Sequence, residues 1–136
     1  MTIDEANALC EGMLPDTLGI TFTELEPGHS VATLAVAAPH MSPNGFLHGG
    51  TVVSLADTAC GFGTFVTPGP ERTHFATMNL SCNFLGTARE GLLTCTASLV
   101  HGGRTTQVWD ATVRRDDGRQ IAVFRATQIL LDQPPA

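Results

Sequence analysis

The sequence contains few basic residues and no tyrosine. Lysine and arginine together number seven of the 136 residues and never form a run, whereas aspartate and glutamate number 13, so the formal net charge is −6. A protein that binds nucleic acid independently of its sequence needs a dense basic surface. The composition therefore argues against that class of protein, although two or three local cations would still be enough to hold an anionic ligand.

The cysteines form no recognisable motif. The four of them lie far apart in the chain, with no CxxC pair and with no histidine at the spacing of zinc ligands: Cys10, Cys60, Cys82 and Cys95. We expect each to pack as a small apolar side chain in a reducing compartment. The sequence thus predicts neither a metal site nor a disulfide framework.

Targeting and membrane segments are also missing from the pattern. The first 14 residues, MTIDEANALCEGML, carry three acids and no basic residue, which is unlike a signal or transit peptide. The apolar segment 49–67 is long enough to suggest a membrane span, but glycine, threonine and serine dilute it and Asp57 interrupts it. We therefore expect a cytoplasmic protein.

The hydrophobic patterning predicts a single α+β domain over residues 1–136. Thr2 and Glu5 form a capping box before a short amphipathic helix that ends near Leu14-Pro15. A turn at residues 26–29 separates two strands, and a loop at 39–45 leads into a long central helix that the segment TPGPE terminates. Four strands joined by short connections follow, and a frayed tail, DQPPA, ends the chain. The predicted strands cover 18–25, 30–38, 73–85, 92–101, 105–115 and 120–131, and the central helix covers about 47–66.

Regular alternation in the segment 73–85 predicts which residues share a face of that strand. One face carries His74, Ala76, Met78, Leu80, Cys82 and Phe84, and the other carries Thr77, Asn79, Ser81 and Asn83.

The central helix is apolar on most of its sides, which is typical of a buried helix. The simplest architecture is an antiparallel sheet curled around it, with the small glycine and alanine positions allowing the strands to approach closely. Such a sheet leaves its other face and its edges uncovered, so we expect the protein to dimerise.

Asp57 is the only acidic or basic residue between His48 and Thr67. An ionised carboxylate inside an apolar element costs several kcal/mol unless it is paired or reaches solvent. One explanation is a structural partner, such as a hydroxyl or an arginine on a strand. The other is a carboxylate in a cleft that acts as nucleophile or general base, with basicity raised by partial desolvation.

The start of the central helix offers a second chemical feature. Gly49 and Gly50 lie eight and seven residues before Asp57. Free amides at a helix start, with the positive end of the helix dipole behind them, can stabilise developing negative charge, and glycine lets a carbonyl approach closely. The same residues also suit a plain tight turn. His48 is better explained as a residue that ties the loop to a backbone carbonyl than as a catalytic base. An acid and an oxyanion-type site together suggest acyl transfer.

The motif G-x-x-H-G-G-x-x-x-x-L-A-D resembles the signature of hotdog-fold acyl-CoA thioesterases, in particular the phenylacetate-degradation (PaaI-like) branch of the 4-hydroxybenzoyl-CoA thioesterase superfamily. It is formed by Gly45, His48, Gly49, Gly50, Leu55, Ala56 and Asp57. The element order matches that fold over essentially the whole chain. The resemblance implies hydrolysis of an acyl-CoA thioester to free acid and coenzyme A, without a metal or an organic cofactor.

The resemblance also implies roles for individual residues. Asp57 would attack the thioester or activate water, the Gly49 amide would polarise the carbonyl, and Thr77 would help to hold the acid or the water. The loop residue that is often Asn or Gln, six positions before the histidine, falls on Ser42, while the available asparagine is Asn44. Either side chain could fill the polar role. The family further implies a homodimer with sites at the interface, commonly doubled into a tetramer.

The residues that would bind the CoA phosphates and the acyl group are predicted less specifically. Arg104 and Arg89, with Arg72 and Arg114 as further candidates, are cations that could hold the CoA phosphates, and Gly50 could contact the thioester. Phe46, Phe62, Phe65 and Met78 could line a pocket for an aryl, arylacetyl or medium-chain acyl group, and they are equally good core residues. Three other functions remain open: a hydratase or dehydratase using His48 and Asp57, a non-catalytic acyl-CoA-binding module, and a structural dimer with Asp57 paired internally.

Overall fold

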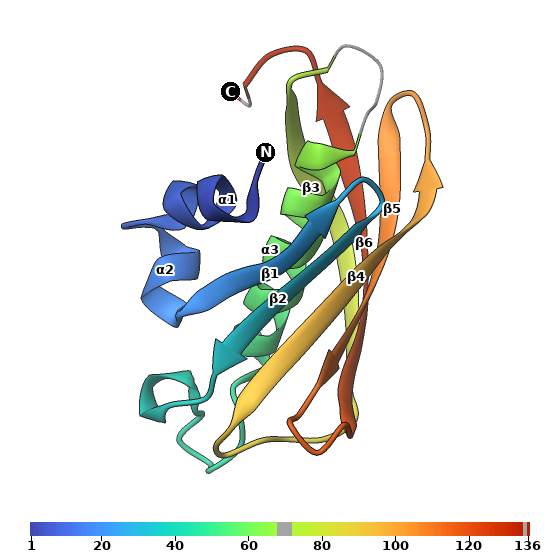
Figure 1. Ribbon diagram of the computed structural model, residues 1–136. Helices are drawn as coiled ribbons and strands as arrows, with labels where there is room; N and C mark the ends of the chain where they lie inside the picture. The colour runs from blue at the N-terminus through green and yellow to red at the C-terminus, as the bar shows by residue number, and fades with distance from the viewer. Residues whose placement is uncertain (68–71, 135) are drawn as a thin grey trace.

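A six-stranded antiparallel sheet curls around one long helix, α3 (Gly49–Val66), in the computed structural model (Figure 1), which describes residues 1–67, 72–134 and 136. The strands follow the order β1-β2-β4-β5-β6-β3 across the sheet. Their bounds are Ile20–Glu26 (β1), His29–Ala35 (β2), His74–Phe84 (β3), Leu92–Gly102 (β4), Thr106–Arg114 (β5) and Gln120–Leu131 (β6). The α+β class and the sheet wrapped around a central helix are confirmed.

The N-terminal segment differs from the single helix that the pattern predicts. The Thr2–Glu5 capping box is present at the start of α1 (Ile3–Cys10), but the helix ends at Cys10. Gly12 then adopts a left-handed φ of 73°, and a second helix, α2 (Leu14–Leu18), begins with Pro15 in its first turn. Proline is favoured at that position because its missing N–H has no intrahelical partner there. Leu14-Pro15 therefore begins a helix and does not end one.

The ends of the other elements differ by a few residues from those predicted. Strand β2 stops at Ala35, and a short 3₁₀ helix, η1 (Ala38–His40), occupies the start of the predicted loop. Helix α3 begins two residues after Leu47, and Thr67 is its C-cap. The remaining residues of the predicted TPGPE stop, Pro68 to Glu71, lie outside the described part of the chain, as does Pro135 in the predicted tail.

Glycines on α3 allow aromatic side chains of the sheet to approach the helix backbone, as the small-residue pattern predicts. A Cβ on Gly63 would lie 2.6 Å from the Trp109 ring, and one on Gly61 would lie 3.4 Å from the Phe75 ring. Trp109 on β5 is fully buried in the core. The core thus depends on small residues on the helix side.

The cysteines contribute to this core in the way the composition suggests. Cys10, Cys60 and Cys95 are buried and Cys82 is partly buried, and all four are free thiols. Burial raises the pKa of the Cys95 thiol to about 12, so it stays protonated at neutral pH. No helix in the described residues is both long and apolar enough to cross a membrane.

Strand β3 forms one edge of the sheet, and its predicted faces are wrong because of a bulge. Thr77 pairs with Gln128 on β6, but Asn79 pairs with Thr127, so Met78 is an extra residue. An inserted residue reverses the alternation beyond it. Before the bulge Phe75 and Thr77 face α3, and beyond it Cys82 and Phe84 do. Thr77 therefore shares the helix side with these two residues.

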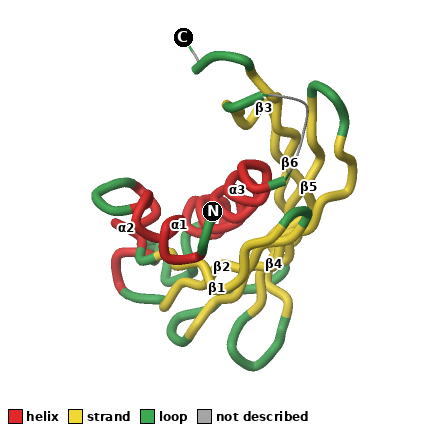
Figure 2. Tube along the Cα trace, turned by 45° about the horizontal axis from the view of Figure 1, so that its top comes forward, coloured by secondary structure: helices red, strands yellow, loops and turns green. Residues whose placement is uncertain are grey.

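The open side of the molecule lies between α3 and the β3 edge. Helices α1 and α2 lie beside β1, at the other edge of the sheet, and leave α3 uncovered toward β3 (Figure 2). Most of β3 is exposed, including the large apolar side chains of Met78, Leu80 and Phe84. This side carries the residues of the candidate site.

Candidate active site

Asp57 projects from the open side of α3 toward β3. Its Oδ1 accepts a hydrogen bond of 2.9 Å from Thr77 Oγ1. The Asp57 side chain is partly exposed, and none of the ion pairs among the described residues includes it. The carboxylate is therefore neither neutralised by an arginine nor enclosed by its own chain, which removes the internal ion pair as an explanation for it.

The bulge in β3 lies immediately after the residue that holds Asp57. With Met78 as the extra residue, Thr77 is the last residue of the first half-strand to face the helix. Its hydroxyl also lies 3.0 Å from Oε1 of Gln128, the residue directly opposite on β6, whose side chain is fully buried. No motif in the sequence includes Gln128. The available signal was a glutamine in a row of inward-facing residues of β6 that otherwise holds Phe124, Ala126 and Leu130.

The start of α3 leaves one amide without a partner in the part of the chain that is described. His48 is the N-cap, and its ring Nδ1 accepts a hydrogen bond of 2.8 Å from the Gly50 amide. The Thr51 amide donates to the His48 carbonyl at 3.0 Å. Because helix geometry gives the first amides no acceptor, the Gly49 N–H is the one in this turn that remains for a ligand. The His48 ring thus caps the helix by accepting from an amide N–H, the His48 backbone N–H donates to the His40 carbonyl at 3.0 Å, and the Gly50 amide is occupied.

Gly49 lies against an aromatic ring and borders a cavity. A Cβ on Gly49 would lie 3.0 Å from the Phe84 ring, so a larger residue would displace that ring. The adjoining cavity has a volume of about 510 Å³ and a mostly apolar lining. It is lined by Phe46, Leu47, Gly49, Val52, Phe84, Gly86 and Thr87.

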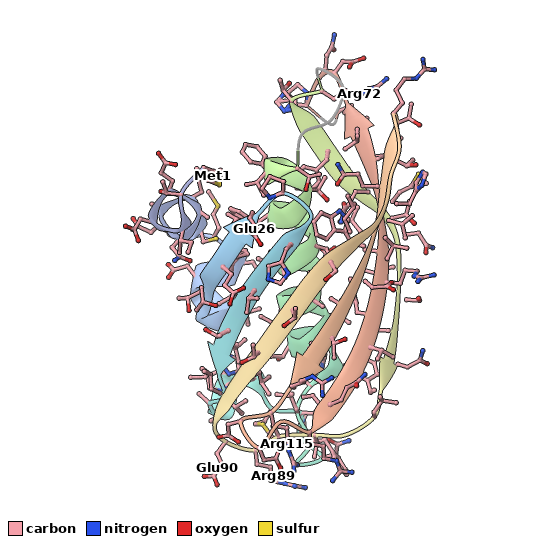
Figure 3. All side chains as sticks on the ribbon, turned by 45° about the vertical axis from the view of Figure 1, so that its right-hand side comes forward. Met1, Glu26, Arg72, Arg89, Glu90 and Arg115 are labelled. Carbon is pink, nitrogen blue, oxygen red and sulfur yellow. The ribbon has the colours of Figure 1, made fainter. Side chains whose placement is uncertain are left out.

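One of the predicted cations lies next to this cavity. The guanidinium of Arg89 lies 5.7 Å above the centre of the Phe46 ring, a cation–π contact. Figure 3 shows Arg89 and Arg115 at one end of the molecule and Arg72 at the other. Arg72 donates to the Leu130 carbonyl, and Arg114 donates to the Gly118 carbonyl. Arg89 is thus the predicted cation that the structure brings to the start of α3.

Other predicted residues lie elsewhere or have different partners. Asn44 is exposed, and its Oδ1 accepts from the Phe46 amide within the loop. The Ser42 carbonyl accepts from the Gly45 amide, and the Ser42 side chain is partly exposed. Phe62 packs against Phe22 in the core, with ring centres 4.6 Å apart.

Three further residues do not line the cavity at Gly49. Met78 is exposed at the bulge, and Arg104 is exposed in the hairpin between β4 and β5, the orange turn in Figure 1. Phe65 borders a separate cavity of about 180 Å³ near the C-terminal end of α3, together with Arg72 and His74. In the described residues, no cluster of three His, Cys, Asp or Glu side chains could hold a metal ion.

Comparison with protein families identifies the chain. Residues 44–122, which include His48, Gly49, Asp57 and Thr77, match the model of the family described as "Thioesterase superfamily". The chain belongs to the thioesterase superfamily. The predicted resemblance to hotdog-fold acyl-CoA thioesterases is thereby confirmed, and the protein is a thioester hydrolase.

Similar proteins agree with this membership. The thioesterase is 32% identical over 114 residues to a 1,4-dihydroxy-2-naphthoyl-CoA hydrolase of Listeria monocytogenes, covering 84% of this chain and 92% of the relative. Its fold matches that of the thioesterase PA1618 of Pseudomonas aeruginosa with a TM-score of 0.90 and 28% identity, covering 96% and 94% of the two chains. The Escherichia coli PaaI protein, from the phenylacetic acid degradation operon, shares the fold with a TM-score of 0.82 at 24% identity and 96% coverage of each chain.

Proposed function

We propose that this thioesterase hydrolyses acyl-CoA thioesters and that Asp57 is the residue that drives the reaction. The hydrogen bond between Thr77 and Asp57 carries the proposal, because it holds a carboxylate that has no counter-ion among the described residues, on the open side of a helix that is otherwise packed. A carboxylate in that situation is available to act on a substrate. Thr77 orients it without neutralising its charge.

The Asp57 carboxylate and the Gly49 amide of one chain are too far apart to act on the same thioester. Gly49 and Asp57 are separated by eight residues of α3, which corresponds to about 12 Å along the helix axis. Reacting atoms and oxyanion donors must lie within about 3–3.5 Å of the thioester carbonyl. Asp57 of one chain therefore acts with the Gly49 amide of a second copy, in a homodimer whose active sites lie at the subunit interface. The exposed apolar residues of β3 fit this assembly, which would be completed by a dimer of dimers.

The chemistry follows from these two groups. As a general base, Asp57 takes a proton from water while the water oxygen bonds to the thioester carbon, and the Gly49 N–H donates to the oxyanion that forms. The oxyanion then collapses, the carbon–sulfur bond breaks, and the CoA thiolate takes up the proton. As a nucleophile, Asp57 would first bond to the thioester carbon while the carbon–sulfur bond breaks and CoA leaves as the thiolate; water would then hydrolyse the resulting mixed anhydride to the free acid and restore the Asp57 carboxylate. His48 supports either route by capping α3 and by occupying the Gly50 amide, which leaves Gly49 as the donor.

The cavity beside Gly49 supports an aryl, arylacetyl or medium-chain acyl-CoA as substrate. Phe46 and Phe84 give it an apolar, aromatic lining, and its volume is about 510 Å³. The relative from Listeria monocytogenes bears the name of an aryl-CoA hydrolase. Arg89, held over Phe46, is a cation at the edge of the cavity where it could meet a CoA phosphate. Arg104 lies in the β4–β5 hairpin and does not line this cavity, so it would contact the CoA from a different part of the dimer than Arg89 does.

A panel of acyl-CoA substrates tests the function. Purified protein is mixed with benzoyl-, phenylacetyl-, octanoyl- and acetyl-CoA, and free thiol is measured with a colorimetric thiol reagent. We expect thiol release from the aryl or medium-chain esters and its loss in Asp57→Asn. Ultraviolet absorbance changes on crotonyl-CoA without thiol release would instead indicate a hydratase. Binding without turnover of any ester would indicate a non-catalytic module, and either result would contradict the proposal.

A further inference from the structure

The Thr77 hydroxyl has two acceptors within hydrogen-bonding distance, and it can donate to only one of them. The Thr77 hydroxyl lies 2.9 Å from Asp57 Oδ1 and 3.0 Å from Gln128 Oε1. Both neighbours are acceptors, and a threonine hydroxyl carries only one hydrogen. Thr77 can therefore donate to one of the two oxygens, and the other contact would be between two oxygens without a hydrogen.

The nitrogen of the same Gln128 amide lacks a hydrogen-bond acceptor within the described ranges of the chain. Gln128 Nε2 is buried and has no hydrogen-bond partner among the described residues. The Gln128 side chain is fully buried within a single chain, so a second copy cannot supply the missing partner. A buried amide N–H without an acceptor loses its hydrogen bonds to water and gains none in the protein, which is strongly unfavourable.

Rotating the Gln128 side-chain amide by half a turn, which exchanges its oxygen and nitrogen, gives both Thr77 and Gln128 suitable hydrogen-bond partners. The oxygen and nitrogen of a glutamine amide are nearly the same in shape, so their assignment has to follow the hydrogen bonds. In the reversed orientation Nε2 lies next to Thr77 Oγ1 and donates to it, and the single Thr77 proton points to Asp57. The amide oxygen then takes the position without a partner, where an unmet acceptor is tolerated better than an unmet N–H.

We infer that Gln128 is a positioning residue, whose amide donates to Thr77 and thereby directs the Thr77 hydroxyl proton to the Asp57 carboxylate. The inference rests on the proposed role of Asp57. The three side chains form one directed chain, from β6 through β3 to α3, and hydrogen bonds in such a chain strengthen one another. Gln128 lies directly opposite Thr77 in the sheet, so the backbone pairing of β3 and β6 fixes the distance.

A matched control comes from the neighbouring strand. Gln107 on β5 pairs with Gln128 on β6, is almost as deeply buried, and accepts a hydrogen bond of 2.9 Å from the Trp109 indole. Gln107→Met therefore also removes a buried amide, but one that contributes nothing to Asp57. We expect its kcat to stay within about twofold of the original enzyme.

A double-mutant cycle on kcat tests the inference. We expect Thr77→Val to lower kcat by about 10-fold to 100-fold, the factor of a hydrogen bond to a charged group. Thr77→Ser keeps the hydroxyl, so we expect it to retain most of the original kcat. Gln128→Met should lower kcat by about 3-fold to 10-fold with little change in KM. Because Gln128 acts through the Thr77 hydroxyl, the double variant should lose no more than Thr77→Val alone. Losses that multiply would overturn the inference.

An NMR measurement decides the hydrogen bond even if no turnover is found. The side-chain amide signals of Gln128 are identified by their absence in Gln128→Met. We expect these protons to exchange slowly with water and to shift in Thr77→Val but not in Thr77→Ser. Signals that do not respond to Thr77→Val would overturn the inference. Absence of thiol release from every acyl-CoA tested would overturn the proposed function instead, so the two failures are distinguishable.

Discussion

The two sides of helix α3 differ in what their residues do. On the side toward the central strands, Gly63 and Ala59 are buried, and the missing Cβ of Gly63 provides the space for the Trp109 ring. On the side toward β3, Ser54 and Asp57 are polar and only partly covered. One side therefore uses small residues to pack the sheet, and the other presents a carboxylate to a space that a single chain does not fill.

This difference explains why an acid can occupy so apolar a segment. The Asp57 carboxylate is not fully desolvated, because its side of the helix remains open in the single chain, and the carboxylate accepts a hydrogen bond from Thr77. The fold thus tolerates the carboxylate, and under the proposed function this carboxylate lies where a second copy would bind. Four substitutions would break or sharpen this comparison.

The largest expected effect is on the open side of α3. Asp57→Asn keeps the size of the side chain and removes the base, so we expect kcat to fall at least about 1,000-fold, toward the upper range for a positioned acid or base. The melting temperature should change little, because no ion pair is lost. Thiol release and thermal unfolding measure the two quantities, with Ser54→Ala on the same side as the control. A variant that keeps the original kcat would end the catalytic assignment.

The next effect is at the start of the same helix. Gly49→Ala places a Cβ 3.0 Å from the Phe84 ring and narrows the approach to the Gly49 amide. Loss of one oxyanion donor typically lowers kcat by about 100-fold to 1,000-fold, and partial displacement should bring the loss to about 100-fold. Steady-state kinetics test this value. An unchanged kcat would show that the amide does not contact the reacting carbonyl.

The packing side of α3 should respond in stability and not in chemistry. Gly63→Ala places a Cβ 2.6 Å from the Trp109 ring, and overpacking of this kind costs about 1–3 kcal/mol. We expect the free energy of unfolding in urea to fall by that amount, while kcat per folded molecule stays within a few fold. A large loss of kcat without a loss of stability would contradict the division of the helix into a packing side and a reactive side.

The smallest effect concerns substrate binding at the edge of the cavity. Arg89→Ala removes the cation above Phe46, and we expect KM for the CoA ester to rise about 5-fold with kcat unchanged, because a solvent-exposed ion pair contributes up to about 1 kcal/mol. Arg119→Ala, an exposed arginine in the β5–β6 hairpin, is the control. Equal KM values for both variants and the original enzyme would exclude Arg89 from substrate binding.

The sequence was sufficient to predict much of the fold. The capping box at Thr2, the apolar helix around Asp57 and the alternating strands gave the right class, order and approximate bounds, because these signals are local. The second N-terminal helix was missed because Leu14-Pro15 can follow one helix or begin another. The 3₁₀ turn at Ala38–His40 has no strong local signal.

The geometry of the site was less accessible from the sequence. The motif predicts roles for Asp57 and Gly49 and the family resemblance predicts one for Thr77, but strict alternation placed Thr77 on the wrong face relative to Cys82 and Phe84. The bulge at Met78 has no glycine or proline to mark it, and its position is set by pairing with a strand about 50 residues later. Gln128 was missed for the same reason, since its contact with Thr77 exists only once β6 and β3 are side by side.

Mixing two inactive variants tests most directly the claim that one site combines Asp57 of one chain with Gly49 of another. Asp57→Asn and Gly49→Val are each expected to be inactive, and they are unfolded together in denaturant and refolded as an equal mixture. In a mixed dimer one of the two sites receives an intact Asp57 and an intact Gly49, so random assortment predicts about a quarter of the original thiol release. A mixture as inactive as its components, although mass spectrometry shows mixed dimers, would contradict the account.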